Sequence, residues 1–158
     1  MNIPPSKILK IELITLAIFS LMITESIAEP PFKSEGPKGE VISIDRTPRR
    51  QVGGGKAIIE IFKEGSSAFI GRLTLAPKAS VPLHRDPTEE YLLIEAGAGM
   101  ITIDGIRSNV KQGDLIYMPA KAEVSFKNGE KPLIALQIFA GPESARKYDQ
   151  WSEVSDKP

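Results

Sequence analysis

Short runs of β-branched and aromatic residues, separated by turn signals at close intervals, constrain the fold of this chain most. Helical periodicity is absent until the C-terminus. Eight such runs cover residues 41–44, 57–62, 68–75, 91–94, 100–103, 114–118, 123–126 and 133–139. Several short strands at near-regular spacing predict an all-β protein, either a sandwich or a barrel.

Turn and end signals refine this prediction. Asp104-Gly105 and Asn128-Gly129 are typical of type I′ hairpin turns, in which both central residues adopt positive φ. The glycine run 53–55 lacks the pattern of a phosphate-binding loop and predicts a hairpin loop instead. Residues 142–151 begin with a proline suited to the first helical position, which predicts a short C-terminal helix packed through Trp151.

The N-terminal segment indicates export. Lys7 and Lys10 precede an apolar stretch at 13–23, and Ser26 and Ala28 supply small residues for cleavage before Glu29. The stretch is far shorter than the roughly 20 residues of a membrane-spanning helix. We therefore expect a signal peptide at 1–28, no stable membrane span after cleavage, and a periplasmic or secreted protein. An uncleaved N-terminal anchor is the alternative.

The remaining chain divides by composition. Residues 29–40 are rich in proline, glycine and charge and predict a flexible leader, followed by a barrel at 41–141 and a helix and tail at 142–158. The 20 basic and 20 acidic residues balance, which removes the electrostatic case for nucleic acid as a partner. The chain has no cysteine, which excludes disulfides, thiolate metal sites and a cysteine nucleophile.

Two spaced motifs carry the chemistry. In the first, His84, Asp86, Glu90 and Gly97 follow one another with one, three and six intervening residues. In the second, the residues that carry the spacing are Gly113, Pro119, Lys121, Val124 and Asn128. This pair of motifs resembles that of the cupin superfamily, with Asp86 in place of the second histidine, Lys121 in place of a glycine and Val124 in place of the last histidine.

The resemblance covers residues 69–139 and implies an antiparallel double-sheet jelly-roll barrel with an interior ligand pocket. In the family, three imidazoles and one carboxylate typically hold a divalent metal. Carried over by position, His84 and Glu90 remain as standard ligands, and Asp86 offers a carboxylate as a third. His84 is the only histidine in the chain, so a site with two histidines and one carboxylate cannot form within one subunit.

Three interpretations of this trio remain open. His84, Asp86 and Glu90 bind a divalent cation that prefers oxygen ligands, such as Mn²⁺, Mg²⁺ or Fe²⁺. Alternatively they form a metal-free polar pocket suited to acid–base work on a small organic ligand. In the third interpretation they are a remnant, in which arginines pair with the acids at the barrel mouth.

Three further residues are candidates for ligand binding. Arg72 shares a strand with Thr74 and would clamp a carboxylate or phosphate if it faced inward, whereas an ion-paired surface role is the alternative. Gln137 interrupts an otherwise apolar strand and is either a pocket hydrogen-bonding residue or part of an exposed edge. Tyr117 lies two residues before Pro119 and either lines the pocket or packs in the core.

The sequence therefore predicts an exported cupin-type barrel that binds a small molecule, with its metal dependence open and no catalytic residue assigned. A cupin-like isomerase, lyase or decarboxylase that uses the reduced site is the first alternative. A non-catalytic structural or dimerisation module is the second. The resemblance also implies a homodimer.

Overall fold

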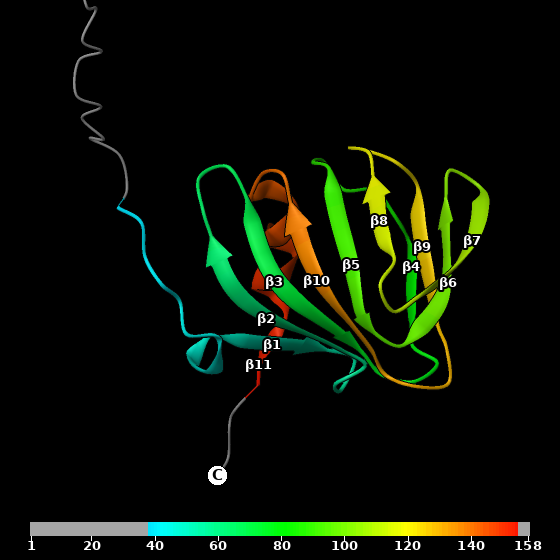
Figure 1. Cartoon of the computed structure of the whole chain (residues 1–158), viewed down its shortest axis with the longest axis horizontal. Helices are drawn as coiled ribbons and strands as arrows, with labels where there is room; N and C mark the ends of the chain where they lie inside the picture. The colour runs from blue at the N-terminus through cyan, green and yellow to red at the C-terminus, as the bar shows by residue number, and fades with distance from the viewer. Residues whose placement is uncertain (1–37, 155–158) are drawn as a thin grey trace, which may run out of the picture. The chain divides into compact units, whose positions relative to one another are not determined.

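The computed structural model describes residues 38–154, which contain eleven β-strands and two 3₁₀ helices (Figure 1). The predicted signal peptide and most of the predicted leader lie outside the described residues. Within them, no helix is long and apolar enough to cross a membrane.

The strands form two antiparallel sheets. The seven-stranded sheet has the order β11-β1-β2-β3-β10-β5-β8, and the four-stranded sheet has the order β4-β9-β6-β7. The first consists of β1 (Arg49–Val52), β2 (Ala57–Glu64), β3 (Phe69–Leu75), β5 (Glu90–Ala96), β8 (Leu115–Met118), β10 (Leu133–Phe139) and β11 (Ser152–Glu153). The second consists of β4 (Ser80–His84), β6 (Ala98–Ile103), β7 (Ile106–Lys111) and β9 (Val124–Asn128). The predicted antiparallel double-sheet jelly roll is confirmed as two sheets, although strand pairing among the described residues does not join them into one closed barrel.

Alternation along the strands determines which side chains face the interior. In β3 and β10 every second residue is buried, and β5 follows the same pattern from Glu90 to Ile94. Two polar residues, Gln137 of β10 and Glu90 of β5, fall on the buried face. Strand periodicity alone therefore directs an amide and a carboxyl group into the core.

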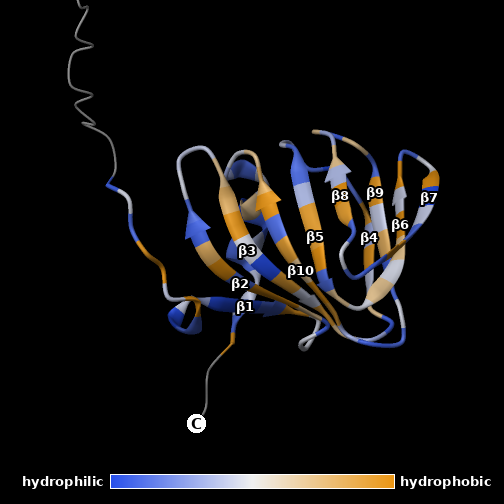
Figure 2. Ribbon diagram, viewed as in Figure 1, coloured by the Kyte–Doolittle hydropathy of each residue, from blue (hydrophilic) through white to orange (hydrophobic). Residues whose placement is uncertain are grey.

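The core joins the two sheets in one cluster of buried apolar residues. Phe69, Leu133 and Phe139 of the larger sheet are almost completely buried, and Ile101 and Phe126 of the smaller sheet belong to the same cluster. Because each sheet buries one face against the other, the interior positions of both sheets are mostly apolar, and Figure 2 shows the apolar residues of β3 and β10 as alternating orange segments.

The Asp104-Gly105 prediction is confirmed. These residues join β6 to β7 and have φ of 47° and 82°. The predicted hairpin loop at 53–55 is also confirmed, since all three glycines have positive φ between the paired strands β1 and β2. Gly97 has φ of 87°, and a Cβ there would lie 2.5 Å from the carbonyl oxygen of Pro132, so no other residue fits this strand end without strain.

The Asn128-Gly129 prediction is wrong, because β9 and β10 belong to different sheets and neither residue has positive φ. Asn128 instead buries its amide at the end of β9. Its Nδ2 donates to the carbonyl oxygens of Leu75, Ala76 and Lys131 at 3.2, 2.7 and 3.0 Å. The asparagine thus ties the end of a strand in the smaller sheet to the end of β3 in the larger one.

The predicted strand at 41–44 is also wrong. Residues 41–43 have no regular structure, and a 3₁₀ helix, η1, covers Ile44–Arg46. The first strand is β1, whose Arg-Arg-Gln-Val sequence is mainly hydrophilic in Figure 2. Strands β4 and β7 were not predicted either, because β4 contains Pro82 and β7 is mostly exposed. Hydrophobic runs reveal strands that bury a face and miss strands that are mainly polar, exposed or interrupted by proline.

The predicted C-terminal helix is present as a 3₁₀ helix, η2, at Glu143–Gln150. Trp151 follows it and packs edge-on against Tyr148, with ring centroids 4.8 Å apart. Two further contacts hold this segment. Strand β11 pairs with β1, and the guanidinium of Arg50 donates to the carbonyl oxygen of Tyr148 at 2.8 Å and to Asp149 at 3.0 Å. The end of the domain is therefore fastened to its first strand.

Candidate functional site

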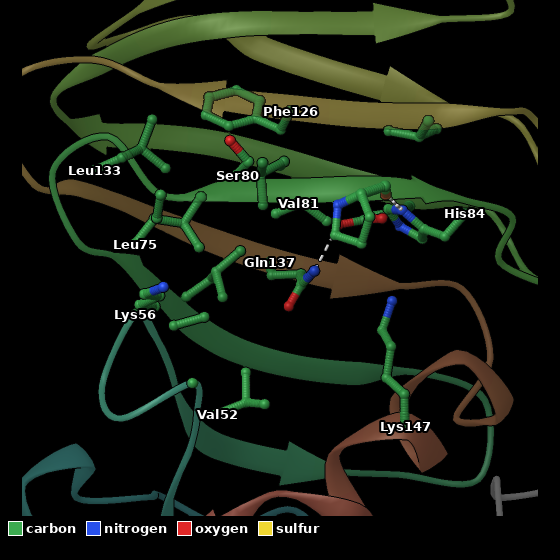
Figure 3. Close-up of a pocket in the computed structure, with 18 of the residues that line it drawn as sticks. Val52, Lys56, Leu75, Ser80, Val81, His84, Phe126, Leu133, Gln137 and Lys147 are labelled. Atoms are coloured by element: carbon green, nitrogen blue, oxygen red, sulfur yellow. Dashed lines mark hydrogen bonds between the residues drawn. The ribbon is translucent and has the colours of Figure 1, made fainter.

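An interior cavity of about 370 Å³ is lined by the inward faces of both sheets (Figure 3). Most of its wall is apolar. The apolar lining includes Leu73, Leu75, Val81, Leu92, Ile101, Met118, Val124, Phe126 and Leu133. These residues come from seven strands, so the cavity is a product of the jelly roll itself and of the strand alternation that points apolar side chains inward.

One end of the cavity is polar. In Figure 3, His84 and Lys147 lie at the end opposite to Val52 and Lys56. His84 ends β4, and Lys147 projects from η2 toward the cavity. A binding site that combines an apolar wall with a few convergent polar groups is typical of small-molecule pockets.

A buried hydrogen-bonded relay lines this end. The hydroxyl of Tyr148 donates to Oε1 of Gln137 at 2.6 Å, and Nε2 of Gln137 donates to Oε1 of Glu90 at 2.6 Å. All three residues line the cavity and are almost fully buried. The tyrosine therefore fixes the orientation of the amide, and the amide donates one N–H to the carboxyl.

Asp86 lies between two basic groups. Both of its carboxylate oxygens accept hydrogen bonds from Nζ of Lys147, at 2.9 and 2.7 Å. Nε2 of His84 lies 3.5 Å from Oδ2 of Asp86, and Nδ1 of His84 lies 2.9 Å from the carbonyl oxygen of Pro82. The ammonium of Lys147 thus balances the negative charge of the Asp86 carboxylate, and the imidazole of His84 lies close to the same carboxylate.

These surroundings shift the pKa values in different directions. Burial raises the pKa of Glu90 and outweighs the hydrogen bond from Gln137. Burial also acts to raise the pKa of Asp86, but the contacts with His84 and Lys147 together lower it. The interaction with Asp86 raises the pKa of His84 against the opposing effect of burial. Two carboxyl groups at one end of the cavity therefore differ in protonation behaviour.

The structure brings some of the predicted site residues together and leaves others out. His84, Glu90 and Gln137 line the cavity, and Asp86 lies directly beside them. Arg72 does not line the cavity. It lies on the opposite face of its strand, with Nε 2.9 Å from Glu95 and NH1 3.5 Å from Glu60, so the ion-paired alternative describes it.

Tyr117 is not a cavity residue either. Strand β8 buries Ile116 and Met118, so alternation places Tyr117 on the outer surface. Its ring packs against Tyr91 at a centroid distance of 5.3 Å, and its hydroxyl donates to Glu89 at 3.1 Å. Neither of the roles considered from the sequence, pocket lining or core packing, matches this position.

Comparison with known proteins identifies the fold. Residues 71–139 match the family model described as "Cupin domain". Residues 71–139 therefore form a cupin domain. The structure is similar to an RmlC-like cupin from Shewanella frigidimarina, with a TM-score of 0.59 at 14% identity over 65% of this chain and 92% of that chain.

Two further cupin-fold structures are similar. One is a predicted oxalate decarboxylase from Thermotoga maritima, with a TM-score of 0.58 at 19% identity over 65% of this chain and 99% of that chain. The other is KdgF from a Halomonas species, with a TM-score of 0.58 at 11% identity over 65% of this chain and 94% of that chain. At these identities the similarity concerns the fold, and function has to be argued from the site.

Strand pairing supports the placement of the two cupin motifs. His84 of β4 is the register partner of Val124 of β9. The histidine position of the second motif therefore lies opposite the first histidine of the first motif. Lys121, which replaces the motif glycine, adopts φ of 65°, the conformation that a glycine favours. The sequence has therefore kept the backbone of a cupin site while changing its side chains.

The side chains present do not fit the cupin metal centre. Val124 has no lone pair, and the ammonium of Lys147 already binds both oxygens of Asp86. Oε1 of Glu90 accepts the hydrogen bond from Gln137. Across residues 38–154 no group of three or more histidine or acidic side chains is arranged to hold a metal ion. The structure thus brings His84, Asp86 and Glu90 near one another without forming the ligand set that the motif implies.

Three residues of the C-terminal segment are among the lining residues that were not predicted from the sequence. Lys147, Tyr148 and Trp151 all line the cavity, although they lie in the C-terminal tail. Tyr148 and Trp151 are three residues apart, a spacing that predicts one shared face of a helix. No comparable signal marks Lys147, because its partner Asp86 is 61 positions away in the chain.

Proposed function

We propose that this cupin is an exported protein that binds a small, mainly apolar molecule in its interior cavity without a bound metal. The cavity of about 370 Å³ supports this most directly, because it falls within the usual size range of ligand pockets. A water molecule takes up about 30 Å³ in the liquid, so the space suits a molecule of roughly a dozen non-hydrogen atoms. Its apolar wall favours a ligand with little polar surface.

A metal-free enzyme is the second candidate, and Glu90 favours it. A buried carboxyl group with a raised pKa that lines a cavity is a typical general acid or base. Isomerase, lyase and decarboxylase chemistry all use such a group. Binding of an apolar molecule that is released chemically unchanged supports the binding protein, whereas conversion of a bound ligand that depends on Glu90 supports the enzyme.

A purely structural module is less well supported. Such a barrel needs a filled interior, whereas the described residues enclose an open cavity with a polar end. A homodimer stays a prediction, and sedimentation of the purified mature protein tests it. Export also stays a proposal, and mass spectrometry of the periplasmic and culture fractions tests it through a mature N-terminus at Glu29.

Equilibrium dialysis with naphthalene tests the proposed function. Ten carbon atoms at about half a kilocalorie per mole each predict a dissociation constant of about 0.2 mM. Val81→Phe fills part of the cavity and should weaken binding at least tenfold. Val41→Phe adds the same bulk at a fully exposed position and is the matched control. Equal binding by both variants would contradict binding in the cavity.

A further inference from the structure

The ammonium of Lys147 is a fixed positive charge at the polar end of the cavity. Its Nζ binds the two oxygens of Asp86 at 2.9 and 2.7 Å. It also lies 4.8 Å from the ring centroid of Phe139 and 5.7 Å from that of Tyr148. One carboxylate and two aromatic faces therefore hold the cation in place, which limits the conformational entropy that a ligand would otherwise have to remove.

Lys147 still has hydrogen-bonding capacity. A lysine ammonium has three N–H donors, and the contacts with Asp86 use two of them. Among the described residues no other acceptor binds Nζ of Lys147. Because this side chain lines the cavity, the remaining donor is available to a molecule inside it.

The neighbouring polar groups are already engaged with one another. The hydroxyl of Tyr148 and the amide of Gln137 are used in the relay to Glu90. Nδ1 of His84 contacts the carbonyl oxygen of Pro82, and its Nε2 faces Asp86. Nε2 of Gln137 keeps a second N–H, so Lys147 is the positively charged donor at this end with a hydrogen bond left to donate.

We propose that Lys147 anchors the ligand, and that the ligand is an apolar molecule with a carbonyl or carboxylate oxygen at one end. This inference rests on the proposed function and names the ligand class of the same cavity. The ligand oxygen accepts a hydrogen bond from the remaining N–H of Lys147, while the apolar body of the ligand lies along the wall that includes Leu92 and Phe126. The ammonium supplies positive charge where the family motif would supply a metal cation, so an oxygen-bearing ligand is recognised without one.

A ligand with a positive charge does not suit this end. A second ammonium would lie beside Lys147 in a low-dielectric cavity, where like charges repel more strongly than in water. Lys56 also lines the cavity but lies at the far end from Lys147 (Figure 3), on an exposed turn. Because Lys147 and Lys56 lie at opposite ends, variants of the two lysines show which end of the cavity binds the ligand oxygen.

Equilibrium dialysis of the mature protein with four probes tests the inference. Acetophenone has a carbonyl, phenylacetate a carboxylate, phenethylamine a cation, and naphthalene no polar group. We expect acetophenone or phenylacetate to bind at least tenfold more tightly than phenethylamine. Lys147→Met should remove this preference. Lys78→Met is the matched control, because Lys78 pairs with Glu130 at 3.0 Å on the surface and does not line the cavity.

Two further variants guard against misfolding. Lys147→Arg keeps the cation and should keep the preference. The double variant D86N/K147M removes both charges together, so it should fold, as circular dichroism would show, and yet lack the preference. The inference would be overturned if the wild type bound phenethylamine and phenylacetate equally well. It would also be overturned if the preference survived in Lys147→Met and disappeared in Lys56→Met. In both cases, binding of naphthalene to the wild type would still support the proposed function. Failure of naphthalene to bind the wild type would overturn the proposed function itself.

Discussion

The apolar wall and the polar end of the cavity are built in different ways. The wall comes from strands of both sheets, each of which points alternate side chains inward. The polar end depends on two residues of η2, Lys147, which meets Asp86 from 61 positions away, and Tyr148, which meets Gln137 of the preceding strand. The wall is therefore a property of the fold, whereas the polar end is a property of this particular sequence.

The largest expected effect is on the wall. Phe126 is buried and lines the cavity, so Phe126→Ala removes apolar burial and enlarges the cavity. We expect a loss of about 3–5 kcal/mol in the free energy of unfolding, measured with urea. Leu115→Ala is the control at an exposed site and should cost less than about 0.5 kcal/mol. Comparable losses in the two variants would contradict the expectation that packing in the apolar wall stabilises the domain.

The second effect concerns metal binding at the polar end. Val124→His restores an imidazole opposite His84. Alone it should gain little affinity for Ni²⁺, because Lys147 still binds Asp86 and repels a cation. Combined with Lys147→Met it should bind Ni²⁺ about a hundredfold more tightly than the wild type, by titration calorimetry. Equal affinity of the single and the double variant would show that Lys147 does not exclude the metal.

The third effect separates the charge of Lys147 from its packing. Lys147→Met leaves the largely buried carboxylate of Asp86 without its main partner, since only 13% of that side chain is exposed. We expect a loss of about 2 kcal/mol in urea unfolding. D86N/K147M removes the uncompensated charge and should recover most of the lost free energy of unfolding. If the double variant is no more stable than Lys147→Met, the loss comes from packing and not from charge.

The smallest effect is a pH dependence at Glu90. Its pKa is raised in the folded state, so the native protein holds this proton to a higher pH than the unfolded chain does. Stability is therefore fully present below the unfolded pKa and declines as the pH rises through the folded one. Glu90→Gln keeps the acceptor for Gln137 and should be more stable than the wild type at pH 8 by about 1 kcal/mol.

Acid conditions should reduce this difference in stability. At pH 4 the advantage of Glu90→Gln should shrink, because the wild-type carboxyl is then mostly protonated in the unfolded chain as well as in the native protein. Thermal unfolding of the two proteins across this range measures it. A constant difference at every pH would mean that Glu90 does not titrate differently in the folded and unfolded states.

The sequence predicted the wall much better than the polar end. Runs of β-branched and aromatic residues between turn signals predicted most strands that bury a face, and the spacing of His84 to Gly97 predicted the family. The interior position of Gln137 was one of two alternatives considered, since a polar residue in an apolar strand is compatible with either face. The β10 register decided for the interior.

The polar end was less predictable for a physical reason. Local periodicity reports which face of an element is buried, and it does not report which distant element supplies a partner. In the sequence nothing distinguishes Lys147 from an exposed helix lysine, and its contact with Asp86 becomes apparent only from the position of η2. Arg72 and Tyr117 were candidates because of their residue types, and strand alternation places both away from the cavity.

The pairing of β1 with β11 has a consequence for the order of folding events. Arg50 and Glu153 are register partners, so β1 gains its outer neighbour only when the segment that follows all the other strands folds back onto it. The segment that supplies Lys147 and Tyr148 is fastened by the same contact. Most of both sheets can thus assemble before this contact forms, and the binding site is completed only when it does.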